Sequence, residues 1–351
     1  MNYGRLEGND VLEERILGRT NLKVKVLGFG GIPIQRVSEK EAIEVVRRCY
    51  DLGINYFDTA RLYSVSEDRI GKALEDVREK VFIATKSICR TENEFLQELD
   101  ISLKDLRTEW IDVYQLHNVS SKEDWIKISS PGGALDAAYK ALDRGKIKHL
   151  GITSHNSSIL TDIVKKDIFE VIQIPYNYLS LMAKEELLPL CNKMNVGTVI
   201  MKPMAGGEFS RADVALKFIL KDENVDVVIP GMMSVAEIEE NIAIASQSYD
   251  LNADDLILIE EDKNRLGTQF CRGCDYCQPC PQEIPISNIL RVESFVKRLK
   301  GTDKLKELVK GSKEKVDSCI DCGECESRCP YHLPIREMFH EKIEYIDRNI
   351  K

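Results

Sequence analysis

Four polar side chains of complementary chemistry lie at or just beyond the ends of three apolar, β-branched runs. Asp58 and Tyr63 follow the run that begins at residue 54, Lys86 ends the run from 81, and His117 ends the run from 111. If these runs are successive parallel strands, an acid, a phenol, an amine and an imidazole meet at one end of a sheet. This group suits carbonyl reduction, because hydride arriving on carbon builds negative charge on oxygen that a nearby acid must neutralise.

Tyr63 is the expected general acid. A free tyrosine has a pKa near ~10, and an adjacent ammonium such as that of Lys86 lowers it by favouring phenolate. Asp58 would keep Lys86 charged and oriented, and His117 would hydrogen-bond the substrate oxygen. The alternative is that Tyr63 and His117 only pack or bond a loop, and that Asp58 and Lys86 form a structural pair. Four complementary groups on three successive strands favour the catalytic interpretation.

Eight of the eleven cysteines lie in two short runs near the C-terminus, which indicates metal ligation rather than disulfides. The second run fits C-x2-C-x2-C-x3-C-P, a pattern of [4Fe–4S] ligation. The first run is a variant of this pattern, with two residues instead of three between its last two cysteines. In such runs the fourth cysteine can ligate the other cluster. We therefore expect two clusters, with one as the minimum. Their expected ligands are Cys271, Cys274, Cys277 and Cys329 for the first, and Cys319, Cys322, Cys325 and Cys280 for the second.

Two structural zinc sites of four cysteines each are the alternative for these runs. The third cysteine of each run and its Cys-Pro ending fit a cubane cluster better. Cys49, Cys89 and Cys191 lie in segments with apolar periodicity and are expected to be small buried hydrophobes.

Alternating strand and helix patterns must position the four polar groups. Eight strand candidates begin near residues 24, 54, 81, 111, 147, 171, 197 and 225, the first covering 24 to 30. Amphipathic helical patterns include 39 to 53, 66 to 78, 93 to 106 and 234 to 246. An open flavodoxin-like sheet usually has about five or six strands, whereas eight βα units close a barrel. The sequence predicts an α/β (β/α)8 TIM barrel over residues 14–262.

A small, mainly helical iron–sulfur domain is expected over residues 263–351, where the cysteine runs flank a charged helical stretch that extends to residue 310. The chain has 351 residues, 43% of them hydrophobic, and a formal net charge of −9. This excess of acidic over basic residues argues against nucleic acid or an anionic membrane as the main partner. No apolar run approaches the ~20 residues of a bilayer span, and the polar first residues lack a signal-peptide core, so a cytoplasmic location is expected.

Four segments carry a resemblance to the aldo-keto reductase family over roughly residues 15 to 250. They are LGRTNLKVKVLGFGG, GINYFDTARLYSVSEDRIGKAL, VFIATKS and VYQLH. The D-T-A, Y and S-E-x-x-I-G string is specific to that family. The resemblance implies the catalytic roles argued above for Asp58, Tyr63, Lys86 and His117, together with a nicotinamide cofactor, NAD(P)H. Helical sequence between the cysteine runs makes the second domain look like an α-helical ferredoxin.

The same resemblance implies a set of nicotinamide-contacting positions. Ser154 and Gln173 match positions that bind the carboxamide, but His155 stands where the family usually has Asn, and Met201 or Lys202 stands where an aromatic ring often stacks. The full set is Gly30, Ser154, His155, Gln173, Lys202, Pro230, Gly231, Ser234, Glu237, Glu240 and Asn241.

The segment after the eighth strand bears on the choice of cofactor. A helix beginning near Val235 would offer its N-terminal N–H groups to the cofactor's phosphates. By resemblance, Gly231 and Glu237 replace the lysine and arginine that grip the adenosine 2′-phosphate, although Lys202 or Arg211 could supply the missing charge. Because a carboxylate repels a 2′-phosphate and can bond a ribose hydroxyl, we expect no strong preference for NADPH.

Two functions compete. The first is an NAD(P)H-dependent oxidoreductase acting on a small carbonyl or alcohol, with fused clusters for electron transfer, redox sensing or structure, and with an electron-carrier protein as a further partner. The second is a non-catalytic, nicotinamide-binding iron–sulfur adaptor for electron transfer. Nicotinamide gives two electrons as hydride and a cubane cluster accepts one at a time, so direct coupling needs a flavin or another splitter, and no flavin motif stands out.

Overall fold

The computed structural model describes residues 12–299 and 303–350. The chain divides into two compact units, residues 1–255 and 256–351. Most of the polar N-terminal stretch that lacks a signal-peptide core lies outside the described residues. Within the described part of the chain, no helix is both long and apolar enough to cross a bilayer.

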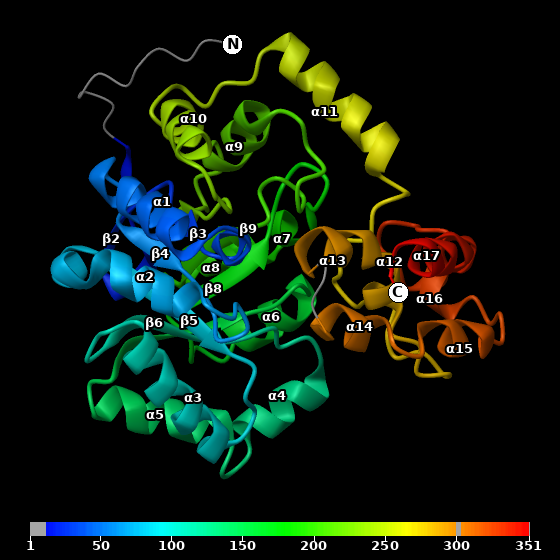
Figure 1. The fold of residues 1–351 in the computed structure, drawn as a ribbon, viewed down its shortest axis with the longest axis horizontal. Helices are drawn as coiled ribbons and strands as arrows, with labels where there is room; N and C mark the ends of the chain where they lie inside the picture. Colours follow the sequence, from blue (N-terminus) through cyan, green and yellow to red (C-terminus); the bar gives the residue numbers. More distant parts are fainter. Residues whose placement is uncertain (1–11, 300–302, 351) are drawn as a thin grey trace. The chain divides into compact units, whose positions relative to one another are not determined.

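Eight parallel strands form the centre of the first unit (Figure 1). Each strand pairs with the next along the chain, and bridges from Leu27 to Val228 and from Gly30 to Gly231 join the first strand to the last. The strands are β3 (Phe29–Gly30), β4 (Tyr56–Asp58), β5 (Phe82–Ser87), β6 (Ile111–Leu116), β7 (Ile147–Thr153), β8 (Val171–Pro175), β9 (Gly197–Met201) and β10 (Val227–Val228). The predicted (β/α)8 barrel is confirmed.

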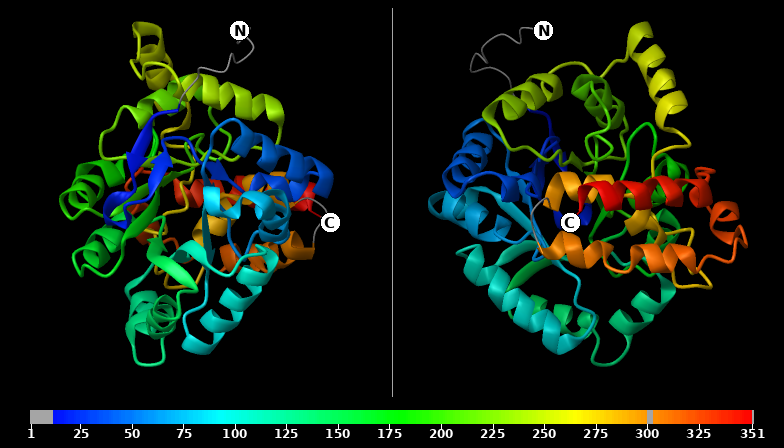
Figure 2. Two further views of the ribbon diagram at one scale, coloured as in Figure 1. Left: turned by 90° about the vertical axis from the view of Figure 1, so that its left-hand side faces the viewer. Right: turned by 45° about the vertical axis from the view of Figure 1, so that its right-hand side comes forward.

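Helices follow the strands around the outside of the barrel, as both views of Figure 2 show. The α-helices are α1 (Glu39–Asp51), α2 (Ser66–Leu74), α3 (Glu92–Asp105), α4 (Lys122–Ser129), α5 (Ala134–Asp143), α6 (Ser157–Val164), α7 (Met182–Glu185), α8 (Leu187–Lys193), α9 (Ala212–Leu220) and α10 (Val235–Ala245). Helix α11 (Ala253–Leu266) begins in the first unit and continues into the second. Short 3-10 helices are η1 (Gly18–Thr20), η2 (Pro33–Arg36) and η3 (Glu75–Lys80). The four predicted helical stretches match α1, α2 with η3, α3 and α10.

The first predicted strand, 24 to 30, is wrong in its N-terminal half. Residues 23–25 form β2 (Lys23–Lys25), which pairs antiparallel with β1 (Glu14–Ile16), and only Phe29–Gly30 belongs to the barrel strand. Val24 and Leu17 instead pack with inward-facing strand residues such as Tyr56 and Val199. The hairpin does not join the barrel sheet, because its apolar side chains pack over the N-terminal end of the barrel interior.

In the described residues of the second unit, helices are joined by loops and turns, without strands. Its helices are α12 (Ile286–Leu290), α13 (Val292–Leu299), α14 (Asp303–Val309), α15 (Ser312–Asp317), α16 (Glu324–Ser327) and α17 (Ile335–Asn349). A small core gathers α12, α17 and cysteines of both runs, including Ile289, Phe339, Cys271 and Cys329. The mainly helical domain is confirmed, and residues 300–302 of the predicted charged helix lie outside the described residues.

Candidate active site and cysteine sites

A buried ion pair joins two of the predicted catalytic residues. Lys86 Nζ donates to both carboxylate oxygens of Asp58 and to the carbonyl oxygen of Thr59, each at 2.7 Å. The two side chains are 1% and 3% exposed. Burial raises the pKa of Asp58 and lowers that of Lys86, and the attraction between the two charges limits both shifts.

Tyr63 and His117 lie beside this pair. Lys86 Nζ is 5.3 Å from the centroid of the Tyr63 ring, and the Tyr63 and His117 rings meet edge to face with centroids 6.2 Å apart. Burial, followed by the charges of Lys86 and Arg90, lowers the pKa of His117 to about 3. His117 is therefore a neutral imidazole at physiological pH, able to donate or accept one hydrogen bond. The structure brings all four predicted catalytic residues together.

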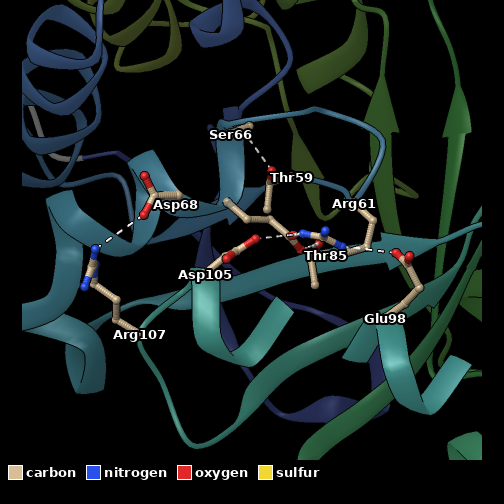
Figure 3. A network of polar contacts seen from close by, with 9 residues as sticks. Thr59, Arg61, Ser66, Asp68, Thr85, Glu98, Asp105 and Arg107 are labelled. Atoms are coloured by element: carbon tan, nitrogen blue, oxygen red, sulfur yellow. Dashed lines mark hydrogen bonds and ion pairs between the residues drawn. The ribbon is translucent and has the colours of Figure 1, made fainter. Parts of the chain in front are cut away.

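The loop that carries Tyr63 is held by a polar network drawn in Figure 3. Arg61 pairs with Glu67 and also binds Glu98 at 3.1 Å and Asp105 at 3.0 Å, and Glu67 accepts from Thr85 Oγ1 at 2.6 Å. These contacts anchor the loop on both sides of Tyr63 to α3 and β5. The residue pattern alone had predicted no role for Arg61 or Glu67.

A second connection fixes the same loop to the first barrel strand. Thr59 Oγ1 donates to Ser66 Oγ at 2.8 Å, and Ser66 Oγ donates to the carbonyl of Gly31 at 2.9 Å. A β-carbon at Gly31 would stand 2.8 Å from Ser66 Oγ, so glycine is needed for this approach.

Gln115 is a further residue of the site that the sequence analysis missed. It is fully buried on β6, and its Nε2 lies 3.4 Å from Asp58 Oδ2. A β-carbon at Gly151 would stand 2.8 Å from Gln115 Cγ, so the adjacent strand leaves room for the amide. Strand alternation could have found Gln115, because it lies two residues before His117 and so faces the same side.

The positions proposed for the nicotinamide carboxamide lie just after β7 and in the middle of β8. Gln173 is buried, and in the described part of the chain its Oε1 has no hydrogen-bond partner. Ser154 is buried and its Oγ accepts from the backbone N–H of Asn156 at 2.9 Å. His155 Nδ1 lies 3.0 Å from Asn118 Oδ1. An unpartnered acceptor at Gln173 fits the NH2 of a carboxamide.

The remaining predicted cofactor positions fall into two groups. Gly30 is beside Asp58 in register, and Gly30, Pro230 and Gly231 meet where the first and last strands close the barrel. Lys202 follows β9 with a positive φ of 57° and accepts at its carbonyl from Asn177. Ser234, Glu237, Glu240 and Asn241 follow one another along the start and first turns of α10.

The N-terminus of α10 carries its own cap. Ser234 Oγ accepts from the N–H of Glu237, and Glu237 Oε2 accepts from the N–H groups of Met233 at 2.7 Å and Ser234 at 3.1 Å. The carboxylate that was expected to bond a ribose hydroxyl therefore already binds two backbone N–H groups. It still places a negative charge at the helix end proposed for the cofactor's phosphates.

In the second unit, cysteines of the two runs lie near one another. Cys280 lines one cavity with Cys319, Cys322 and Cys325, and its empty volume is about 380 Å³ including space open to solvent. Cys277 also lines it. Cys329 lies close enough to Cys274 and Cys277 for its charge to influence both thiols. Among the described residues no three His, Cys, Asp or Glu side chains converge as ligands of a single metal ion.

Comparisons with known proteins agree with this architecture. The chain is 28% identical over 301 residues to L-galactose dehydrogenase of Arabidopsis thaliana, covering 71% of this chain and 93% of that protein. An aldo-keto reductase structure from Bacillus halodurans, in its holo form, is 25% identical with a TM-score of 0.63 over 72% of this chain and 96% of that one. An aldo/keto reductase structure from Klebsiella pneumoniae in complex with NADP and acetate, 19% identical, shares the fold, with a TM-score of 0.60 over 72% and 95% of the two chains.

Two family models match separate parts of the chain. Residues 270–334, which contain all eight clustered cysteines, match the 4Fe-4S dicluster domain. Residues 26–213, from the first barrel strand to the start of α9, match the aldo/keto reductase family. With a closed barrel whose β4, β5 and β6 ends bring together the acid, phenol, amine and imidazole, the chain belongs to the aldo/keto reductase family and carries a ferredoxin-type domain at its C-terminus.

Proposed function

We propose that this protein is an enzyme that transfers hydride between NAD(P)H and a small carbonyl or alcohol substrate. The observation that carries the proposal is the position of the Lys86 ammonium, buried against Asp58 and 5.3 Å from the Tyr63 ring centroid. A positive charge at this distance favours the phenolate over the phenol and so brings the proton of Tyr63 within reach of neutral-pH chemistry.

Each residue of the site has a distinct task. The Tyr63 hydroxyl gives its proton to the substrate oxygen during reduction and takes it back during oxidation. The Asp58 carboxylate and the Thr59 carbonyl hold Lys86 in place through the three 2.7 Å hydrogen bonds. His117 stays neutral, because its pKa is about 3, and orients the substrate oxygen without competing as a strong acid. The nicotinamide supplies or accepts the hydride when it is bound.

The cofactor would be held by residues that directly follow β7 and that lie within β8. Gln173 Oε1, buried without a partner in the described residues, would accept a hydrogen bond from the carboxamide NH2, and Ser154 follows the neighbouring strand. Gly30, Pro230 and Gly231 let the dinucleotide approach the backbone where the barrel closes. The relative named L-galactose dehydrogenase supports a small hydroxylated molecule as the alcohol substrate.

The C-terminal domain holds two [4Fe–4S] clusters with exchanged ligands. The hollow lined by Cys280 with Cys319, Cys322 and Cys325 supports one of them. The neighbourhood of Cys329, Cys274 and Cys277 supports the other. Cubane clusters would supply one-electron transfer to the domain, and an electron-carrier protein is the partner that would suit this chemistry.

Replacing Tyr63 by phenylalanine tests the enzymatic proposal. The variant should reduce carbonyls about 10² times more slowly or worse, while nicotinamide binding stays nearly unchanged, because only the proton donor is lost. Tyr139→Phe is the matched control, since Tyr139 is an exposed phenol on α5. Unchanged turnover in Tyr63→Phe would remove Tyr63 from the mechanism. Cofactor binding without any turnover by the native protein would instead support the adaptor.

A further inference from the structure

We propose that Gln115 is a positioning residue of the reaction: its buried amide stabilises the ionised Asp58 carboxylate and so keeps the Lys86 ammonium charged beside Tyr63. The inference rests on the hydride-transfer function proposed above. Gln115 acts through the ion pair and does not itself exchange a proton with the substrate.

Gln115 lies in the barrel interior at the level of the ion pair. It is the register partner of Lys86, across the pairing of β5 with β6, and it is fully buried. Its Nε2 donates to Asp58 Oδ2 at 3.4 Å. The next register partner, on β7, is Gly151, where a β-carbon would stand 2.8 Å from Gln115 Cγ. The glycine therefore leaves the space in which the amide reaches Asp58.

Packing alone gives no reason for an amide at this position. Gln115 Oε1 is buried, and within residues 12–299 and 303–350 it has no hydrogen-bond partner. An unsatisfied buried acceptor destabilises a fold, whereas an apolar side chain of similar length would not leave one. The orientation of the amide follows from its neighbour, because the Asp58 carboxylate would repel a carbonyl oxygen turned toward it. What the glutamine contributes is therefore its N–H donor to Asp58.

Burial acts against both charges of the ion pair. It raises the pKa of Asp58 and lowers that of Lys86, and both shifts favour transfer of a proton from Nζ to the carboxylate. In the resulting neutral pair no ammonium remains beside Tyr63. A hydrogen bond from an amide N–H stabilises a carboxylate more than a neutral carboxylic acid, so it favours the charged pair.

Two amides interact with Asp58 in this way. Gln173 also acts as a side-chain hydrogen-bond donor to Asp58. Because Gln173 has a proposed contact with the nicotinamide as well, its replacement would disturb two functions at once. Gln115 has no proposed contact with the cofactor, so support of the ion pair can be tested at this position by itself.

Gln115→Met is the test substitution, since methionine has a similar length and lacks the amide. Its kcat for carbonyl reduction should fall about tenfold or more, the effect of about one pKa unit on proton transfer. The Kd values for NADH and NADPH, measured by nicotinamide fluorescence, should stay within about twofold of the native values. The solvent deuterium isotope effect on kcat should rise, because proton transfer becomes more limiting. Gln97→Met, at an exposed glutamine of α3, is the matched control and should leave kcat unchanged.

Two measurements that need no turnover separate this role from a structural one. Because Gln115→Met removes an unsatisfied buried acceptor, its midpoint of urea unfolding should stay at or above the native value while kcat falls. Infrared difference spectra against Asp58→Asn should show an ionised Asp58 in the native protein and a band of the protonated acid in Gln115→Met. Gln115→Leu repeats both measurements with a second apolar side chain.

A second background tests whether Gln115 acts through Lys86. In Lys86→Met, adding Gln115→Met should change the residual rate by less than about twofold, because no ammonium remains to be kept charged. The inference is overturned if Gln115→Met and Gln115→Leu keep the native kcat, if Asp58 stays fully ionised in both, or if the full loss of rate persists in the Lys86→Met background. A native protein that reduces no carbonyl would instead refute the proposed function, and the infrared comparison does not depend on that result.

Discussion

Lys86→Met isolates the buried ion pair at the centre of the proposed active site. Methionine has nearly the length of lysine, so the change removes the ammonium and its three 2.7 Å hydrogen bonds with little loss of packing. Asp58, 3% exposed at its side chain, then keeps only its contacts with amides such as Gln115. Removing one partner of a buried pair usually costs about 3–5 kcal/mol. We expect the free energy of unfolding to fall by this amount.

Adding Asp58→Asn to Lys86→Met separates stability from catalysis. The second change removes the stranded carboxylate and leaves an amide, so roughly half or more of the lost stability should return. Carbonyl reduction should stay at least about 10² times slower than in the native protein, because no ammonium remains beside Tyr63.

Urea unfolding and steady-state kinetics of the native protein, both single variants and the double variant measure this cycle. If the losses in unfolding free energy of the two single variants add up in the double variant, Asp58 and Lys86 do not stabilise each other in the fold. Recovery of turnover in the double variant would show that Lys86 serves structure alone and would refute its assignment beside Tyr63.

Three further predictions concern the clusters, the cofactor and pH. Cys329→Ser should damage the cluster of Cys271, Cys274 and Cys277, and loss of only the other cluster's spectrum would refute the exchanged ligation. The kcat/KM for NADPH should be at most about tenfold above that for NADH, or roughly 1.4 kcal/mol; a larger ratio rejects the argument from Glu237. Burial raises the pKa of Asp226 from 3.8 to about 6, so its ionisation destabilises the fold as pH rises from about 4 through 6. The stability of Asp226→Asn relative to the native protein should therefore rise by up to about 3 kcal/mol between pH 4 and pH 7.5, whereas the same difference in urea unfolding at both pH values would contradict this origin.

Much of the barrel and its central site could be predicted because both depend on local patterns. Apolar runs alternate with amphipathic stretches, and a parallel barrel places the end of every strand on one face. Asp58, Lys86 and His117 end or directly follow such runs, so their proximity follows from topology alone. Tyr63 was harder in principle, because it lies in a loop; its position depends on the contacts of Arg61 and Glu67 with α3 and β5.

Other features depend on partners that are remote in sequence. Val24 was predicted to begin a barrel strand, but it packs with Leu17 against Val199 and belongs to a hairpin instead. Glu237 looked like a ribose ligand, yet the local requirement of a helix N-terminus for acceptors turns its carboxylate to the N–H groups of Met233 and Ser234. The capping pattern S-x-x-E was visible in the sequence and could have corrected that interpretation.

The N-terminal hairpin sets an order for folding during synthesis. Arg15 donates to the carbonyls of Leu220 and Val225, and the N–H of Arg19 donates to the carbonyl of Asn195 at 2.7 Å. These partners are translated about two hundred residues after the hairpin. Its apolar side chains must therefore wait, exposed or held by a chaperone, until β9 and β10 have left the ribosome. Nascent chains ending before residue 225 should be protease-sensitive in the hairpin, at residues 14–25, even when the early βα units are already compact.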